Sequence, residues 1–242
     1  MDKPRIGKLS FAVAAALACV LAPGVAAAAC PPRNDAPRPQ LNRNDLNLAV
    51  ARCTNEQGSI VEADVMAACN GIVAYTCFPA RGGPLFSVDD LESLSWAYRL
   101  RANAHITYGR TTEALADLND ADAAQPRDFT TLLSRCRVRA ATRTELDSAL
   151  SDCNTAIELR PRTPFALDSR GLVHLQRGDY AAAIVDYDAA IAAEPNLVSS
   201  LYGRAIARAR LGQSAESQAD AIAATALDPQ IVAEFESFGL SL

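Results

Sequence analysis

The chain has 242 residues, half of them apolar, so it can bury a substantial core in one or two domains. Its net charge of −5 argues against nucleic acid as a partner. Alanine is abundant, while Val, Ile and Thr are sparse outside the first third, a composition that favours helices over strands and predicts an all-α protein.

Residues 1–29 have the pattern of a secretion signal peptide. Lys3, Arg5 and Lys8 precede an uncharged apolar run of 14 residues, which a Pro-Gly pair ends. The alternative is a membrane anchor, but a run of 14 residues is too short to cross about 30 Å of hydrocarbon as a helix. We therefore expect cleavage after Ala29, export to a bacterial periplasm, and a mature chain with no transmembrane span and a net charge of about −7.

Residues 30–45 begin with Cys30 and continue with the sequence PPRNDAPRPQ, so we expect a disordered, Pro-rich tether. A lipid-modified Cys30 is the alternative to a soluble exported protein. Bacterial lipidation signals usually place Leu three residues before the cysteine, where this chain has Ala27. We favour the soluble form, in which Cys30 is an ordinary thiol or disulfide partner.

Residues 46–79 contain two helical stretches and close with Pro79, and their length matches the repeat unit that follows. We interpret them as a degenerate N-terminal helical hairpin. Residues 80–90, ARGGPLFSVDD, are predicted to form a loop before Asp89 or Ser93 caps the next helix.

Residues 95–231 repeat at a nearly constant interval. The prolines that close the copies are separated by 35, 34 and 34 residues, and they are Pro126, Pro161, Pro195 and Pro229. We place the one inserted residue between the first two copies. The four copies are then 95–128, 130–163, 164–197 and 198–231. Each copy contains two helical patterns joined by a short turn.

Small residues fall where the two helices of a copy must touch, such as Gly171 in the first helix and Ala183 in the second helix of the third copy. Position 8 of the four copies holds Ala102, Arg137, Gly171 and Ala205. Arg137 departs from this pattern, so we expect looser packing within the second copy.

The period and the pattern of Gly, Tyr, Ala, Phe and Pro resemble the tetratricopeptide repeat family over residues 95–231. The resemblance implies an α-solenoid of stacked antiparallel helical hairpins, in which the first helix of each copy lines a concave side. Residues 232–242 restart a first helix, with Phe235, Phe238 and Gly239 at positions 4, 7 and 8, and then stop. We interpret them as a C-terminal cap helix that covers the apolar face of the last repeat.

Six cysteines would remain after cleavage, an even number in an exported protein. Cys53 and Cys69 lie at facing positions of the upstream hairpin, and Cys136 and Cys153 lie at facing positions of the second copy. We predict one disulfide within each hairpin, worth roughly 3 kcal/mol for a loop of this length. A metal or redox site is the alternative, but the chain has neither a CxxC motif nor a His beside a Cys, so we expect no metal.

No motif of a hydrolase nucleophile, a zinc protease, a P-loop or a dinucleotide site occurs, so we expect no enzymatic activity and no cofactor. His105 and His174 both fall at position 11, where the family usually places a packed tyrosine, and we interpret them as buried imidazoles. Acidic pairs such as Asp186 with Asp188 are assigned to helix starts or solvated faces.

Positions 2, 5, 6 and 9 of the first helices are predicted to be free of packing and to form a partner-binding groove. Their mixture of aromatic and aliphatic side chains with few charges is typical of a peptide-binding surface. In chain order the groove residues are Trp96, Arg99, Asn103, Thr131, Arg135, Val138, Phe165, Asp168, Leu172, Ser199, Tyr202 and Ile206. The alternative is that Trp96 and Phe165 pack on neighbouring repeats or on the N-terminal segment.

Some members of the family hold a partner's carboxylates with a clamp of basic and amide side chains. Arg99 and Asn103 match the first two places of that clamp, but Phe165 and Ser169 stand where its later basic residues belong, so a full clamp is not expected.

These patterns favour an interaction module of the bacterial cell envelope that binds a peptide or helix of a protein partner in its groove. One alternative is a structural protein that self-associates as a homo-oligomer. Another is a cell-wall-related enzyme or binding protein with a site in residues 40–90.

Overall fold

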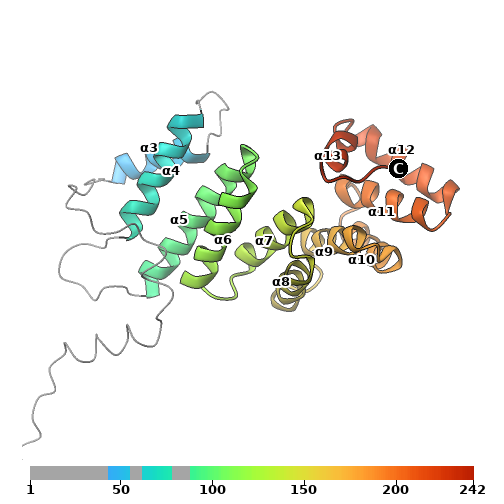
Figure 1. Cartoon of the computed structure of the whole chain (residues 1–242), viewed down its shortest axis with the longest axis horizontal. Helices are drawn as coiled ribbons and strands as arrows, with labels where there is room; N and C mark the ends of the chain where they lie inside the picture. Colours follow the sequence, from blue (N-terminus) through green and yellow to red (C-terminus); the bar gives the residue numbers. More distant parts are fainter. Residues whose placement is uncertain (1–42, 55–61, 78–87) are drawn as a thin grey trace, which may run out of the picture.

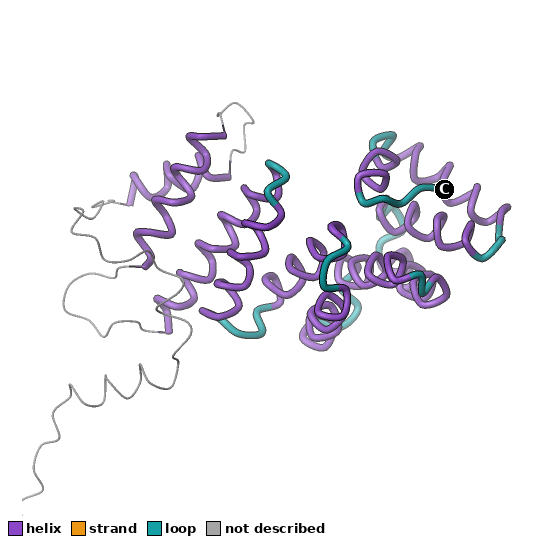
Figure 2. Tube along the Cα trace, viewed as in Figure 1, coloured by secondary structure: helices purple, strands orange, loops and turns teal. Residues whose placement is uncertain are grey.

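The protein is described here by a computed structural model, which covers residues 43–54, 62–77 and 88–242. The described residues form helices and no strand (Figures 1 and 2), so the predicted all-α class is confirmed. The predicted signal peptide, the predicted tether and Cys30 lie outside the described residues. The helices are α3 (Arg43–Thr54), α4 (Glu62–Cys77), α5 (Val88–Thr107), α6 (Thr111–Ala124), α7 (Phe129–Thr142), α8 (Leu146–Leu159), α9 (Pro164–Arg177), α10 (Tyr180–Ala193), α11 (Val198–Arg210), α12 (Ser214–Leu227) and α13 (Ile231–Ser237).

Helices α3 to α12 pair as five antiparallel hairpins that stack in chain order, and α13 follows alone (Figure 1). One apolar core fills α3 to α6 around Tyr98, and another fills α7 to α13 around Tyr187. A small cluster of Ala102, Leu118 and Val138 joins the two cores. The stack is therefore an α-solenoid, as predicted.

The single inserted residue lies in the turn between α7 and α8, and not between the first two copies. Helix α7 begins at Phe129, which is 35 residues before the start of α9 at Pro164. Helix α8 begins at Leu146, only 34 residues before the start of α10 at Tyr180. The prediction that Arg137 occupies position 8 is therefore wrong by one residue, because Cys136 stands there.

That turn also differs from its counterparts in backbone conformation. Gly178 ends α9 with φ = +81°, a left-handed conformation that glycine adopts at low cost, and the turn after it is short. The longer turn after α7 has two non-glycine residues in this conformation, Arg143 at φ = +56° and Glu145 at φ = +46°. The extra residue is thus accommodated in the turn within the hairpin.

A ring between two glycines sets the spacing of the third and fourth copies. Tyr187 is fully buried, and a Cβ atom built on Gly171 would lie 2.7 Å from its Cε1. A Cβ atom built on Gly203 of the next hairpin would lie 2.4 Å from its Cζ. Any side chain at either glycine would collide with the ring, so both glycines permit the close approach of three helices.

Disulfides take the place of this contact in two other hairpins. Cys136 and Cys153 are bonded and both are fully buried, at the positions that Gly171 and Tyr187 hold in the third copy. Cys53 and Cys69 are bonded in the same way between α3 and α4. Both predicted pairings are confirmed.

An ion pair between the two helices recurs in each hairpin from α5 to α12. In the third copy Arg170 donates from Nε and Nη2 to the two carboxylate oxygens of Asp186, at 2.8 and 2.6 Å. Asp186 is 3% exposed, so the expectation that it lies on a solvated face is wrong. The equivalent pairs are Arg101 with Asp117, Arg135 with Asp152, and Arg204 with Asp220. We call these four pairs the polar ladder.

The polar ladder also joins neighbouring hairpins. Nη1 of Arg170 donates to Asn154 of the preceding hairpin at 2.9 Å, and Arg101 reaches Asn70 of α4 at the same distance. The hairpin α3–α4 therefore stacks on α5 as the later hairpins stack on one another. A second basic side chain, at position 11 of each first helix, lies within 4 Å of the same carboxylate. These side chains are His105, Arg139, His174 and Arg208.

The two histidines are therefore packed against the polar ladder. His105 is 8% exposed, and its burial lowers the pKa of the imidazole, although the Asp117 carboxylate acts in the opposite direction. The neutral imidazole is thus the form that the fold favours. A buried carboxylate destabilises the fold unless it is paired, so each basic neighbour helps to fix how the two helices of a hairpin face each other.

Candidate functional site

The predicted groove residues of the first copy lie on α5 and are partly free. Trp96 is 36% exposed and Asn103 is also exposed. Arg99 is engaged, because its Nη1 donates to Asp128 at 2.6 Å. Asp128 also accepts the backbone N–H of Thr131 at 2.8 Å and so caps the start of α7. Arg99 therefore ties α5 to α7 and is not a free clamp residue.

The Asp128 carboxylate is held in its charged form. Burial alone would raise its pKa, but the backbone N–H of Thr131 and the Arg99 guanidinium outweigh burial and lower the pKa. Near neutral pH, the charged Asp128 carboxylate therefore keeps its ion pair with Arg99, which joins α5 to α7.

The predicted groove residues of the second copy are packed inside the stack. Thr131 is fully buried, Val138 is 6% exposed and belongs to the cluster that joins the two cores, and Arg135 belongs to the polar ladder. The misplaced insertion caused this error, since it moved each position by one residue. With α7 counted from Phe129, the residues at positions 2, 5, 6 and 9 are Thr130, Leu133, Ser134 and Arg137.

The predicted groove residues of the third and fourth copies have the expected positions, but most are buried. Phe165 is 51% exposed, whereas Leu172 and Tyr202 are each 3% exposed and Ile206 is fully buried. Asp168 is also buried and accepts a hydrogen bond from Ser200 Oγ at 2.6 Å. We call the concave surface of α7, α9 and α11 the inner wall.

The inner wall is covered by residues 231–242, which we call the C-terminal segment. Ile231 and Phe235 of α13 are each 2% exposed and belong to the same apolar core as Leu172 and Ile206. The Phe235 ring meets the Tyr202 ring edge-on, with centroids 5.2 Å apart. The burial of the predicted groove in this half of the protein therefore has an internal cause.

Side chains from all three wall helices hold the C-terminal segment. Arg137 of α7 pairs with Glu234 at 3.1 Å. Gln176 of α9 donates from Nε2 to the carbonyl oxygen of Phe238 at 3.0 Å, and Arg210 of α11 donates to the carbonyl oxygen of Ser241 at 2.9 Å. Two of these three polar contacts are to main-chain oxygens, so part of the binding does not depend on the side chains of the segment.

The C-terminal segment ends its helix with a tight cap. Gly239 has φ = +74°, its N–H donates to Glu236, and the N–H of Leu240 donates to the carbonyl oxygen of Phe235 at 3.0 Å. This is a Schellman motif, which places Leu240 back over the helix that it follows. The motif gives the segment a compact shape that fits across the three wall helices.

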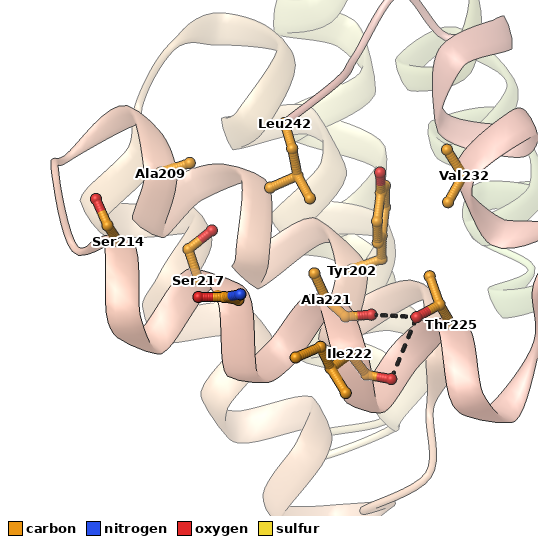
Figure 3. A pocket seen from close by; sticks show the side chains of 10 residues that line it. Tyr202, Ala209, Ser214, Ser217, Ala221, Ile222, Thr225, Val232 and Leu242 are labelled. Carbon is orange, nitrogen blue, oxygen red and sulfur yellow. Dashed lines mark hydrogen bonds between the residues drawn. The ribbon is translucent and has the colours of Figure 1, made fainter.

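The expected cap over the last repeat is formed only in part. Ile231 and Phe235 of α13 share an apolar core with Ala224 of α12. An open hollow of about 380 Å³ remains beside α11 and α12, drawn in Figure 3. Its lining residues are Tyr202, Ala209, Ser214, Ser217, Gln218, Ala221, Ile222, Thr225, Val232 and Leu242. Ile222 remains 61% exposed, so the C-terminal segment leaves part of the α12 face open.

Residues Arg137, Gln176 and Arg210 were not assigned to the site from the sequence. Arg137 carried a signal, because a large basic residue stood out at a position assigned to small residues. Correct placement of the insertion would have moved it to position 9, on the inner wall. Gln176 and Arg210 contact main-chain atoms of the C-terminal segment, which is distant in the sequence, and no local sequence pattern predicts such contacts.

Within the described residues, no group of three or more His, Cys, Asp and Glu side chains is arranged to hold a metal ion. No helix in the described part of the chain is both long enough and apolar enough to span a membrane.

No protein-family model and no curated protein matches the chain at the level of sequence. Solved structures do match its fold. A tetratricopeptide repeat protein from Parabacteroides merdae superimposes with a TM-score of 0.56 at 20% identity, over 80% of this chain and 70% of that chain. The MamA protein superimposes with a TM-score of 0.54 at 14% identity, over 81% of this chain and 97% of that chain.

A third structure, YrrB, is described as a tetratricopeptide repeat protein with an unusual peptide-binding site. It superimposes with a TM-score of 0.53 at 16% identity, over 81% of this chain and 90% of that chain. At these identities the likeness concerns the fold. The chain therefore has the tetratricopeptide repeat fold.

Proposed function

We propose that the protein is an interaction module of the bacterial cell envelope that binds a short helix or peptide of a protein partner on its concave surface. The observation that carries this proposal is that the inner wall already binds a polypeptide segment, its own residues 231–242, through Arg137, Gln176 and Arg210. A surface that satisfies main-chain carbonyl oxygens and buries an aromatic side chain is suited to a peptide ligand.

The exposed part of the concave surface supports the same proposal. Trp96 and Phe165 keep 36% and 51% of their surface exposed, and both lie at position 2 of a first helix. Large aromatic side chains are enriched at the anchor points of protein interfaces. A partner that contacts these rings would extend along the concave surface beyond the C-terminal segment.

The cell-envelope location is part of the proposal. It is supported by the two intramolecular disulfides, which form and persist in oxidising compartments such as the periplasm. The predicted absence of enzymatic activity is kept as part of the same proposal.

The test is position-specific photo-crosslinking with the purified mature chain in envelope extracts. A crosslinking amino acid replaces Phe165 on the concave surface in one variant and Val185 in a matched control. Val185 lies on α10, a second helix of a hairpin, and is 67% exposed. We expect the same protein to be captured repeatedly at Phe165 and not at Val185. Capture at Val185 alone, or at neither position, would refute a concave binding site.

A further inference from the structure

We propose that the C-terminal segment is a tethered competitor for the inner wall, and that the partner which displaces it is a short acidic amphipathic helix with the same contact groups. This inference rests on the proposed function and adds to it the chemistry of the partner and the way in which access to the site is regulated.

The apolar side of the segment defines the first requirement. Ile231 and Phe235 are four residues apart, so they lie on one face of α13, and each is 2% exposed. Phe235 meets Tyr202 edge-on, a geometry that aromatic pairs favour. A partner helix needs two apolar side chains at this spacing, with an aromatic ring at the second place.

The charge around the segment defines the second requirement. Glu234 pairs with Arg137, and the side chains of both residues are about two-fifths exposed, at 40% and 41%. An ion pair at this exposure adds little affinity but favours ligands of one sign. Two further arginines border the segment, since Arg210 bonds to Ser241 and Arg143 lies beside Gly239. The wall thus favours an acidic ligand.

The segment is held in a way that allows displacement. Helix α13 has seven residues, which is too short to be stable in water without docking. Gln176 is 8% exposed, and its Oε1 has no hydrogen-bond partner among the described residues, although its Nε2 bonds to Phe238. A buried acceptor without a donor destabilises the docked state. A partner that places a donor there would fit better than the chain's own segment.

The link to α12 makes the competition effective. Only residues 228–230 separate α12 from α13, so the segment stays close to the wall at an effective concentration in the millimolar range. An external helix can bind only those molecules whose inner wall is open, so its apparent affinity equals the intrinsic affinity multiplied by the fraction of open molecules. Weakening the segment should therefore strengthen the binding of an external ligand.

The experiment uses a labelled synthetic peptide with the sequence of residues 229–242 and measures its fluorescence anisotropy with full-length mature protein. The Phe235→Ala variant weakens the internal segment and leaves every wall residue unchanged. We expect the peptide to bind this variant at least about tenfold more tightly than the wild type. A peptide carrying Glu234→Lys should bind more weakly. Arg137 also pairs with the buried Asp168 at 3.2 Å, so Arg137→Gln, which adds no negative charge beside that carboxylate, is the matched change in the variant protein and should remove the preference between the two peptides.

Circular dichroism of the Phe235→Ala protein checks that it is folded. Phe238→Ala, which removes a side chain that is only half-buried, repeats the measurement with a milder change. Absence of peptide binding to both folded variants would overturn the proposal, as would equal binding to the wild type and the variants. Equal binding of the two peptides would overturn the acidic requirement. A wild-type dimer that the peptide dissociates would assign the wall to the segment of a second copy instead.

This outcome is independent of the crosslinking test. If a partner is captured at Phe165 but the peptide does not bind, the proposed function stands and the tethered competitor is refuted. If the peptide binds but nothing is captured at Phe165, the competition by the C-terminal segment stands, and capture of a partner protein at Phe165 is refuted.

Discussion

The sign of a glycine-to-alanine substitution at Gly203 should depend on the residue at position 187. A Cβ atom at Gly203 would lie 2.4 Å from Cζ and 2.5 Å from Oη of Tyr187. The ring cannot move away, because Gly171 borders it on the other side, where a Cβ atom would lie 2.7 Å from Cε1. In the wild-type background, Gly203→Ala should therefore destabilise the protein.

The magnitude follows from two opposing effects. Alanine in a helix interior is favoured over glycine by about 1 kcal/mol. Overpacking of a filled core costs roughly 1 to 3 kcal/mol, and a ring confined on both sides places this site near the upper limit. We expect Gly203→Ala to lower the free energy of unfolding by about 2 kcal/mol.

Tyr187→Leu supplies the background in which the sign should reverse. It removes the atoms that the new Cβ would strike, and the first copy already uses Leu118 opposite Ala102 at the equivalent pair of positions. In this background Gly203→Ala should be stabilising by up to about 1 kcal/mol, since only the helix-propensity effect remains. The four proteins of this double-mutant cycle are compared by urea unfolding. Equal effects of Gly203→Ala in both backgrounds would refute the close contact.

Four further changes test the packing. Ala183→Leu should destabilise by about 1 to 3 kcal/mol through overpacking, and an unchanged melting curve would contradict the close helix contact. Asp186→Ala should lower the free energy of unfolding by about 3 kcal/mol, measured by urea unfolding. This value is at the lower end for a broken buried ion pair, because the guanidinium of its partner Arg170 is partly exposed. Replacing both Cys136 and Cys153 by Ala should lower the free energy of unfolding by roughly 3 kcal/mol in the same assay, and an unchanged value would refute a stabilising role for this bridge. The pKa of His105 is lowered in the fold, so the unfolded chain binds the proton more readily than the folded protein. The melting temperature should therefore fall as the pH is lowered from about 6.5. His105→Gln should make this fall smaller.

The repeat architecture could be predicted from the sequence because its signals are local and recur. The closing prolines and the small residues at position 8 set the period, and the cysteine spacing identified two bridges. The polar ladder was also readable, since Arg170 and Asp186 recur at the same interval as the prolines. It was missed because acidic residues were assigned to the solvent by default.

The position of the insertion could not be set from prolines alone. Proline spacing shows that a residue has been added between Pro126 and Pro161, but it does not show where. The cysteines held the answer, because Cys136 and Cys153 are 17 residues apart while Cys53 and Cys69 are 16 apart. Both pairs connect equivalent positions, so the longer separation places the extra residue in the turn between them.

The position of α13 depends on two surfaces that compete for the same apolar side chains. In the third copy, Ile184 and Ile191 of α10 pack into the core beneath α11. Gln218 and Thr225 stand at the equivalent places of α12, so its outer face is more polar and gains less from a covering helix.

The segment itself is also poorly suited to cap α12. In the first helix of each repeat, position 7 holds the arginine of the polar ladder, whose carboxylate partner comes from the second helix of the same hairpin. The C-terminal segment has Phe238 at this position. Docked in the register of a repeat, the segment would therefore have no guanidinium with which to form the ion pair of the polar ladder. On the inner wall, Ile231 and Phe235 are each 2% exposed and pack with Tyr202 in one apolar core, and this loss of exposed apolar surface favours the observed position of the helix.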